Sequence, residues 1–334
     1  MKKKALISGA SGQDGAYLAK LLLEDGYVVY GASRDAQTCS FTNLQRLKIR
    51  EQVHTVSIAA NDFRSVLNAV LEVEPDEIYN LAGQSSVGLS FEQPVETLES
   101  ISTAALNFLE VIRFTHRPIR FYNAGSSECF GDTGGSKADE ETPFRPRSPY
   151  AVAKASAHWI VANYREAYNM FACTGILFNH ESPLRPERFV TGKIIAAACR
   201  IAAGSQEKLM LGNMDIRRDW GWAPDYVHAM KLMLQQNKPQ DYVIATGYSR
   251  PLEDFVRLAF AELGLDWCEH VISDKKLLRP TDIREGCGNP AKAERDLGWK
   301  ATFQLEDVVR EMVRAVWQSK NLASLAPPLS QVVP

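Results

Sequence analysis

Near its start the chain reads Lys4-Ala5-Leu6-Ile7-Ser8-Gly9-Ala10-Ser11-Gly12-Gln13-Asp14-Gly15. Lys4–Ser8 is typical of a β-strand, and Tyr17–Glu24 has leucines on one face of a helix. A tight turn between them requires glycine, and glycine also lets the backbone approach a pyrophosphate at the positive end of the helix dipole. The pattern predicts a dinucleotide-binding turn with cofactor contacts from Gly9, Ser11, Gly12, Gln13, Asp14 and Gly15.

Strands and helices alternate along roughly the first 150 residues, a length that suits one domain. Further strands are predicted at Tyr27–Gly31, Gln52–Ser57, Glu77–Leu81 and Ile119–Ala124, and helices at Phe63–Val73 and Thr103–Thr115. Strict alternation implies a parallel sheet with helices on both faces. The predicted fold class is therefore α/β, with a doubly wound, Rossmann-like parallel sheet.

Beyond Phe178 the sequence is richer in Pro, Arg and Gly, with a helix predicted at Lys193–Ala203. A short strand at Tyr242–Thr246 is expected to return to the main sheet. We expect a cofactor domain at 1–178, completed by that strand near 242–246, and a smaller, interleaved α/β substrate domain at 179–320. Residues 321–334 have no periodicity and are expected to be disordered.

Composition excludes several classes of protein. The 334 residues carry 38 Lys+Arg and 40 Asp+Glu, a formal net charge of −2 that gives no reason to expect a nucleic-acid partner. No apolar run approaches the roughly 20 residues that cross a bilayer, and the run ending at Ser8-Gly9 is too short for a signal peptide. The six cysteines lack metal-type spacing and are typical of reduced thiols. We predict a cytoplasmic protein with no membrane or nucleic-acid partner and no metal site.

The end of the second strand usually selects between NAD and NADP, because an acid there accepts the ribose hydroxyls of NAD. Here Ser33 takes the position of that acid, and Arg34 follows it. A hydroxyl and a guanidinium suit a 2′-phosphate, so NADP is the predicted cofactor and NAD is the alternative. Asp35 would repel the phosphate if it turned inward, and we expect it to face solvent in its loop.

Tyr150 and Lys154 lie four residues apart in Ser148-Pro149-Tyr150-Ala151-Val152-Ala153-Lys154. Ser148 is a favourable N-cap and Pro149 suits the first helical position, so a helix is predicted to begin here. Tyr150 and Lys154 then share one helix face. A tyrosine, with a pKa of about 10, is a poor base at neutral pH, but a neighbouring ammonium stabilises the phenolate. Tyr150 is therefore a candidate base that takes a hydroxyl proton while a hydride leaves the same carbon.

Further candidates follow the strand that ends at Ala124, in Gly125-Ser126-Ser127-Glu128-Cys129. The carboxyl ends of parallel strands face the ligand crevice, so Ser126 can hydrogen-bond the reacting hydroxyl. A simple reductase needs no carboxylate here, whereas a β-elimination needs one to remove a carbon-bound proton and to help water depart. Glu128 fits that role, and a solvated loop acid is the alternative. The predicted catalytic residues are Ser126, Glu128, Tyr150 and Lys154.

These motifs resemble the extended short-chain dehydrogenase/reductase family of nucleotide-sugar enzymes, and within it the GDP-mannose 4,6-dehydratases. The GxxGxxG spacing belongs to that superfamily, and the resemblance extends from Ser8 to about Met312. Its most specific stretches are residues 12–18, 145–154, 175–183, 211–215, 218–221, 288–293 and 297–300.

The resemblance implies a reaction. Tyr150, supported by Lys154 and Ser126, would be the base for hydride removal from C4 of GDP-mannose. Glu128 would abstract the C5 proton and assist loss of the C6 hydroxyl, and the hydride would return to C6 to give GDP-4-keto-6-deoxymannose. The implied cofactor contacts are Arg34, Asp62, Leu81, Ala82, Tyr150 and Lys154. The implied GDP-sugar contacts are Ser85, Asn179, Lys193, Arg218, Arg279 and Asp282, among them the cations that a diphosphate needs.

The chain departs from the family pattern in several places. Ser126 stands where Thr is common, and Arg34-Asp35 stand where two arginines are usual, the second supporting cofactor and tetramer contacts. Asp282 is one methylene shorter than the usual Glu, and Ser57–Asp62 lacks the usual Gly-Asp-Leu near the adenine. In the wider family the helices corresponding to Thr103–Thr115 and the one from Pro149 form a dimer interface, so a homodimer or homotetramer is expected.

Two alternatives stay open from the sequence. The first is a sister GDP-sugar enzyme, either a GDP-heptose 4,6-dehydratase or a GDP-4-keto-6-deoxymannose reductase that would consume NADPH stoichiometrically. The second is a non-catalytic dinucleotide-binding protein, which the full set of Ser126, Tyr150 and Lys154 disfavours. His180 is expected to be structural.

Overall fold

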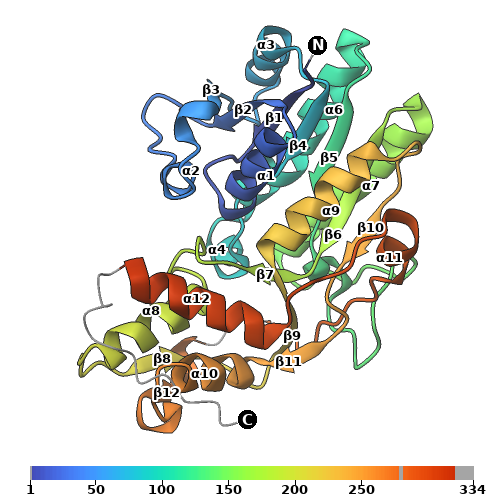
Figure 1. Ribbon diagram of the computed structural model, residues 1–334. Helices are drawn as coiled ribbons and strands as arrows, with labels where there is room; N and C mark the ends of the chain where they lie inside the picture. The colour runs from blue at the N-terminus through green and yellow to red at the C-terminus, as the bar shows by residue number, and fades with distance from the viewer. Residues whose placement is uncertain (1, 278–280, 320–334) are drawn as a thin grey trace.

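The structure, a computed structural model, describes residues 2–277 and 281–319. Its main sheet has seven strands, all parallel (Figure 1). In spatial order they are β10 (Tyr242–Ile244), β6 (Ala172–Leu177), β5 (Arg120–Ala124), β4 (Glu77–Asn80), β1 (Lys4–Ser8), β2 (Val28–Ser33) and β3 (His54–Ser57). The chain order reverses between β1 and β4, which is where open α/β sheets bind their ligands.

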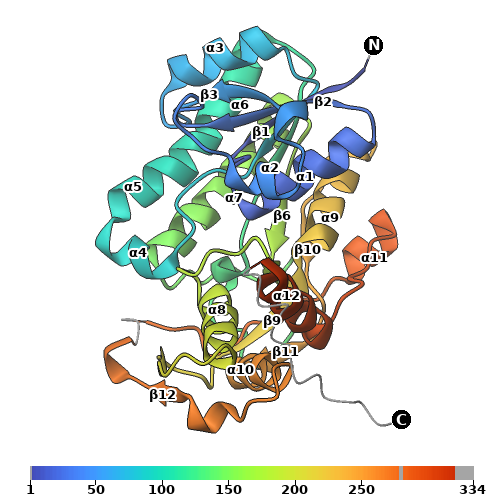
Figure 2. The ribbon, with the colours of Figure 1, turned by 60° about the vertical axis from the view of Figure 1, so that its left-hand side comes forward.

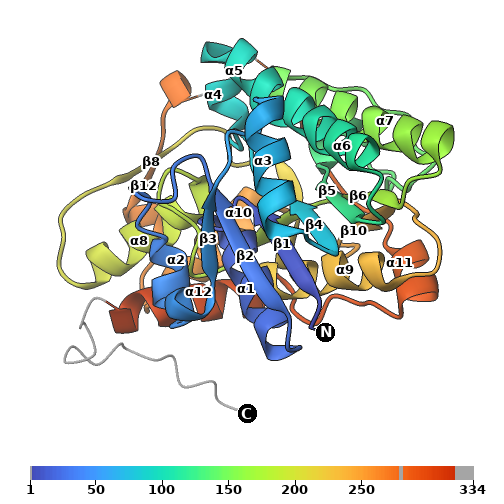
Figure 3. The ribbon, with the colours of Figure 1, turned by 90° about the horizontal axis from the view of Figure 1, so that it is seen from above.

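Helices cover both faces of this sheet, which confirms the predicted doubly wound fold (Figure 3). One face carries α3 (Phe63–Val73), α6 (Ala104–Thr115) and α7 (Pro149–Tyr168), and the other carries α1 (Gln13–Glu24) and α9 (Ala223–Gln235). Shorter helices are α2 (Thr42–Arg46), α4 (Val87–Glu92) and α5 (Pro94–Leu98). Each face has its own apolar core, with Phe108 and Phe121 in one and Tyr122 and Met230 in the other.

Sequence analysis missed β6, the strand at Ala172–Leu177. All of its residues are buried, because helices cover the sheet on both sides of it. A strand of this kind is continuously apolar instead of alternating, and periodicity cannot distinguish it from a buried helical segment.

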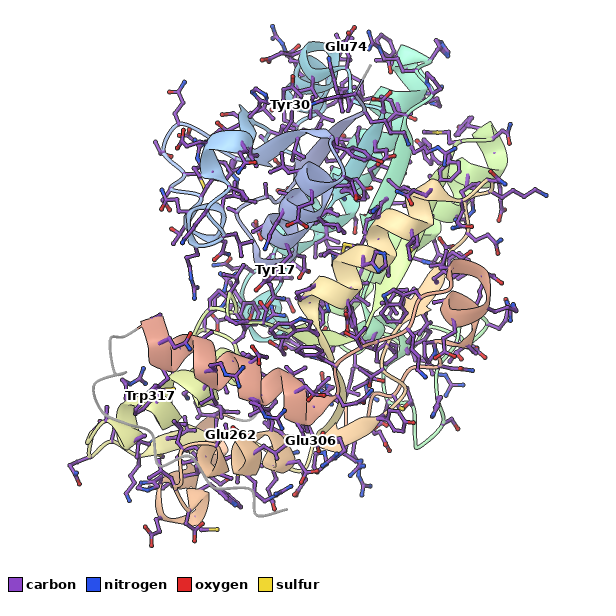
Figure 4. All side chains as sticks on the ribbon, in the orientation of Figure 1. Tyr17, Tyr30, Glu74, Glu262, Glu306 and Trp317 are labelled. Atoms are coloured by element: carbon purple, nitrogen blue, oxygen red, sulfur yellow. The ribbon has the colours of Figure 1, made fainter. Side chains whose placement is uncertain are left out.

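A smaller unit lies below the main sheet in Figure 1. Its strands are β7 (Asn179–Glu181), β9 (Arg217–Trp222) and β11 (Ser249–Pro251) in one sheet, and β8 (Leu209–Leu211) and β12 (Val271–Ser273) in another. Its helices are α8 (Val190–Ala202), α10 (Leu252–Ala261) and α12 (Leu305–Ser319), seen together in Figure 2. They enclose a separate core that includes Trp220, Phe255 and Trp317. In Figure 4, Trp317 and Glu306 lie in this unit, and Tyr30 and Glu74 lie at the far end of the main sheet.

The two units are interleaved along the chain. β10 pairs with β6, so the chain does return to the main sheet. The helix α9 and Trp299 also pack into the core of that sheet, and α11 (Ala291–Leu297) contributes Ala293 and Leu297 to it. The domain boundaries given above remain a proposal, which the separate cores support. The segment 321–334 lies outside the described residues.

Within residues 2–277 and 281–319, no helix combines the length and the apolarity that a bilayer crossing requires.

One ion pair ties β10 to the rest of the sheet. Arg165 of α7 and Asp241, next to β10, form two N···O contacts of 2.8 and 2.7 Å, and Asp241 also accepts the backbone amide of Thr174. Asp241→Ala should lower the free energy of unfolding by about 2 kcal/mol, because it leaves a mostly buried guanidinium without its counter-charge. Urea denaturation measures this change. The control Glu24→Ala, which removes an exposed ion pair, should change it by less than about 0.5 kcal/mol; equal losses in both variants would contradict the assignment.

Candidate active site

Two glycines, Gly9 in the turn between β1 and α1 and Gly15 in the first turn of α1, have no room for a side chain. Gly9 has a φ of +92°, and a Cβ there would lie 2.9 Å from the backbone nitrogen of Ala82. A Cβ on Gly15 would lie 2.7 Å from Cα of Ala10. No side chain caps the start of α1, so its first amides keep their donors for a ligand. The turn therefore fits the pyrophosphate of a dinucleotide.

A cavity of about 260 Å³ lies at the carboxyl ends of the strands, between the main sheet and the smaller unit. All of the predicted catalytic residues line it, namely Ser126, Glu128, Tyr150 and Lys154. So do five of the predicted ligand contacts, namely Asp14, Leu81, Ser85, Asn179 and Arg218. The fold thus brings segments that are far apart in the sequence to one edge of the sheet.

The helix α7 begins at Pro149, as predicted. The hydroxyl of Ser148 caps it by accepting the amide of Ala151 at 3.1 Å. The ammonium of Lys154 lies 5.8 Å from the ring centre of Tyr150 and donates to the carbonyl of Ala124 at 2.8 Å. Burial lowers the pKa of Lys154 to about 8.

The electrostatics of Tyr150 differ from the expectation. Burial raises the pKa of Tyr150 well above its ordinary value of 10.0, and a hydrogen bond with Ser126 offsets only part of this rise. The expected lowering by Lys154 is not seen, because that ammonium is bonded to the carbonyl of Ala124 and not to the phenol. A base at this position needs further positive charge in the cavity.

Glu128 lies on a 3₁₀ turn, Ser127–Phe130, that directly follows β5. The hydroxyl of Ser126 accepts the amide of Glu128 at 3.3 Å. The Glu128 side chain is only 16% exposed, so it is not the solvated loop acid that was the alternative. Its Oε1 lies 4.0 Å from Nε of Arg218. Burial raises the pKa of the adjacent Cys129 thiol to about 12, which disfavours the nucleophilic thiolate.

Arg218 lies on β9, in the smaller unit, and is itself buried. It donates to the carbonyl of Ile283 at 2.8 Å, and it lies 3.4 Å from Asp282. The contact between Arg218 and Glu128 therefore joins the smaller unit to the turn after β5.

A second ion pair joins the glycine turn to β7. Oδ2 of Asp14 lies 2.9 Å from Nε2 of His180, whose ring stacks on Tyr226. Burial raises the pKa of Asp14, but the charge and hydrogen bond of His180 outweigh it and bring that pKa to about 2. For His180 burial lowers the pKa, and Asp14 more than compensates, so the pKa is above 6.5. His180 is bonded on both ring nitrogens, as a structural residue would be.

Other predicted contacts have partners of their own in the structure. Lys193 donates to the carbonyl of Met210 at 2.7 Å and does not line the cavity. Asp62 caps α3 by accepting the amide of Arg64 at 3.0 Å. Arg34 is exposed at the end of β2, and Arg279 lies outside the described residues. Their roles toward cofactor and substrate stay predictions.

The loop at residues 184–188, which follows β7, is expected from the sequence to shape the substrate pocket, but no site residue was predicted in it. Arg185, Arg188 and Phe189 all line the cavity. The two guanidinium groups lie 4.9 and 5.0 Å from the Phe189 ring centre, and Arg185 is also bonded to Glu181. The sequence pattern could have identified these residues, since two arginines close to an aromatic residue suit recognition of a phosphate and a planar base.

The Rossmann-like sheet and a cavity that gathers serine, tyrosine and lysine define the extended short-chain dehydrogenase/reductase class. Within that class, the family model described as GDP-mannose 4,6 dehydratase matches residues 6–312. The chain belongs to this family.

Relatives and solved structures agree with that assignment. The chain is 48% identical over 325 residues to GDP-mannose 4,6 dehydratase 1 of Arabidopsis thaliana, covering 93% of this chain and 89% of the relative. It is 45% identical over 341 residues to GDP-mannose 4,6-dehydratase of Sinorhizobium fredii, covering 94% and 96%. In fold it is similar to dTDP-glucose 4,6-dehydratase from Bacillus anthracis in complex with NAD, with a TM-score of 0.83, 18% identity and coverage of 96% and 98%. It is also similar to RMD from Pseudomonas aeruginosa complexed with NADPH, with a TM-score of 0.77, 20% identity and coverage of 96% and 99%.

The Asp14–His180 pair predicts a pH dependence of stability. Because the folded-state pKa of His180 is raised, its contribution is present below pH 6.5 and is lost as the pH rises through that raised pKa. Because the pKa of Asp14 is lowered from 3.8 to about 2, its contribution is lost as the pH falls through that interval. The free energy of unfolding of the wild type should therefore exceed that of His180→Asn most between about pH 4 and 6.5.

Urea denaturation at pH values from about 4 to 9 tests the prediction, with the exposed His54→Asn as the control. A difference between wild type and His180→Asn that stays constant from pH 5 to pH 9 would contradict it.

Proposed function

We propose that the chain is a GDP-mannose 4,6-dehydratase, which converts GDP-mannose to GDP-4-keto-6-deoxymannose and water. The observation that carries the proposal is the position of Glu128 in the same cavity as Ser126, Tyr150 and Lys154. Membership of the family and the names of the relatives support the choice of substrate.

We propose NADP as the cofactor, held by the glycine turn, with NAD as the alternative. When bound, a nicotinamide dinucleotide supplies the acceptor for the hydride from C4 and its donor to C6. Arg34 at the end of β2 supports NADP. Asp35 does not oppose it directly, because its Oδ1 accepts the amides of Gln37 and Thr38 within its own loop. Structures of similar fold carry either NAD or NADPH, so they favour neither choice.

In the first chemical step Tyr150 takes the proton of the 4-hydroxyl, while the hydroxyl of Ser126 orients that oxygen. Burial raises the pKa of Tyr150, and the charge of Arg185, which lines the same cavity as the ammonium of Lys154, offsets part of that rise and so favours the phenolate. The new ketone at C4 acidifies the neighbouring C5–H bond.

In the second step Glu128 removes the C5 proton and passes a proton to the departing 6-hydroxyl, which leaves as water. The C5–H and C6–O bonds break, and a C5–C6 double bond forms. Reduction at C6 then restores a single bond, and C5 takes up a proton that balances the one lost from the 4-hydroxyl.

Substrate contacts are proposed on the side of the smaller unit. The GDP-sugar would meet Asn179, Arg218 and the arginines 185 and 188, which line the cavity. Ser85, Lys193, Arg279 and Asp282 complete the proposed set. A cytoplasmic location stays a prediction, as does a homodimer or homotetramer. Exposed Phe114 on α6 and Trp159 on α7 support assembly through those two helices.

The decisive experiment incubates the protein with GDP-mannose and a catalytic amount of NADP, followed by mass spectrometry. The dehydratase should release one water per sugar without net consumption of the cofactor. Deuterium placed at C4 should appear at C6, and one deuterium from heavy water should appear at C5. Stoichiometric consumption of NADPH with a 4-keto-6-deoxy sugar would favour the reductase, and loss of water only from a GDP-heptose would favour the heptose enzyme.

Replacement of the carboxylate tests its role separately. Glu128→Gln should lower kcat by about 10²- to 10⁴-fold, because the amide cannot move the C5 proton, and should change KM little. The control is Glu141→Gln, an exposed acid in the following loop, which should keep wild-type kcat. Steady-state kinetics with GDP-mannose measure both. A Glu128→Gln variant that dehydrates the sugar as fast as the parent would rule out this acid/base role.

A further inference from the structure

Arg34 and Glu96 form an ion pair across the switch point of the sheet. Arg34 directly follows β2, and Glu96 lies on α5, which comes after β4. Since β1 lies between β2 and β4, the pair spans the strand that leads into the glycine turn. Nη2 of Arg34 is 3.5 Å from Oε1 of Glu96. In this fold the adenosine half of a dinucleotide binds at that edge, so the pair lies where the ribose is recognised.

The second oxygen of the Glu96 carboxylate is left without a hydrogen bond from the described residues. Oε2 is buried and has no hydrogen-bond partner within the described part of the chain, and the same holds for the hydroxyl oxygen of Ser33. A buried polar atom without a partner is costly, and in native structures it usually indicates a missing ligand or water. A carboxylate oxygen can only accept. The Glu96 side chain is partly exposed, and its carboxylate can accept a hydrogen bond from a ribose hydroxyl, whereas a fully ionised 2′-phosphate has no proton to donate.

The charged side chains near the end of β2 favour a 2′-phosphate less strongly than the sequence suggests. Arg34 is the cation beside the ribose position, and Glu96 lies against it. Oδ1 of Asp35 accepts amides of its own loop, whereas the carboxylate of Glu96 forms an ion pair with the guanidinium of Arg34. A 2′-phosphate bound to Arg34 would meet the carboxylate of Glu96 at close range and be repelled by it.

We propose that Glu96 is a specificity-determining residue that accepts a ribose hydroxyl of NAD and opposes the 2′-phosphate of NADP. Glu96 thereby supplies from α5 the acid that the end of β2 lacks, because Ser33 stands in that position. Arg34 favours NADP and Glu96 counteracts it, so Glu96 narrows the preference for NADP that Arg34 provides. The inference rests on the dinucleotide site of the proposed function, but not on the dehydration chemistry.

The test measures binding of the adenosine halves alone, 2′,5′-ADP for NADP and 5′-ADP for NAD, by isothermal titration calorimetry. Glu96→Gln should tighten 2′,5′-ADP by about three- to tenfold and should weaken 5′-ADP, because the repulsion and the strong acceptor are both lost. The Arg34 and Glu96 side chains are 78% and 43% exposed, so salt should reduce the change. The matched control is Glu99→Gln, an exposed acid three residues further along, which should leave the ratio of the two affinities unchanged.

A double variant isolates the pair. In an Arg34→Gln background, Glu96→Gln should still tighten 2′,5′-ADP, but less than in the wild type, because the repulsion between carboxylate and phosphate remains while the cation that the carboxylate neutralises is gone. Urea denaturation of each variant establishes that it is folded.

Two outcomes would overturn the inference. The first is weaker binding of 2′,5′-ADP by Glu96→Gln, which would mean that Glu96 orients Arg34 for the phosphate. The second is an affinity ratio equal to that of the wild type. Failure of the proposed function is distinguishable from either one. A protein that shows the expected shift in the ratio but releases no water from GDP-mannose would retain this inference and lose the dehydratase assignment.

Discussion

The site depends on close backbone contact around the turn between β1 and α1. Because Gly9 has no side chain, the turn lies directly against Ala82, just after β4, and because Gly15 has none, the first turn of α1 lies directly against Ala10 of that turn. The helix α1 can then begin at the end of β1, with its free amides at the crevice between β1 and β4. A Cβ at either glycine would separate these segments, and the amides would no longer face the crevice. The position of Asp14, on the first turn of α1, follows from the same contact, and through His180 it fixes β7 as well.

Much of this architecture could be predicted from the sequence, because it depends on local and periodic signals. The bounds of β1 and α3 agree with the prediction, since each has a regular apolar pattern bounded by turn or capping residues. The start of α7 was predictable from Ser148 and Pro149, whose capping roles are properties of single residues. The cavity was predictable in outline, because a parallel sheet places the residues after each of its strands at one edge. The strand β6 was not predictable in this way, since burial on both faces removes the alternation.

Properties that depend on partners distant in the sequence were harder to predict. The spacing of Tyr150 and Lys154 predicts a shared helix face, but it cannot reveal that the carbonyl of Ala124 takes the ammonium. The spacing of these two residues also does not reveal how deeply they are buried, and burial decides the direction of the pKa shift of Tyr150. Glu96 carries no motif at all, and its relation to Arg34 appears only when α5 is placed beside the end of β2.

The proposed dehydration would draw on side chains from both units, whereas the groups proposed for hydride transfer come from the main sheet alone. Tyr150, Lys154 and Ser126 come from α7 and the end of β5, so the main sheet assembles them by itself. Glu128 belongs to the same sheet, but its carboxylate lies against Arg218, which β9 of the smaller unit supplies. An acid that must take a proton from one carbon and deliver one to a neighbouring oxygen has to be held in a fixed orientation. Under the proposed function, the smaller unit would therefore do more than bind a nucleotide sugar, since its Arg218 lies against the carboxylate that is proposed to remove the C5 proton.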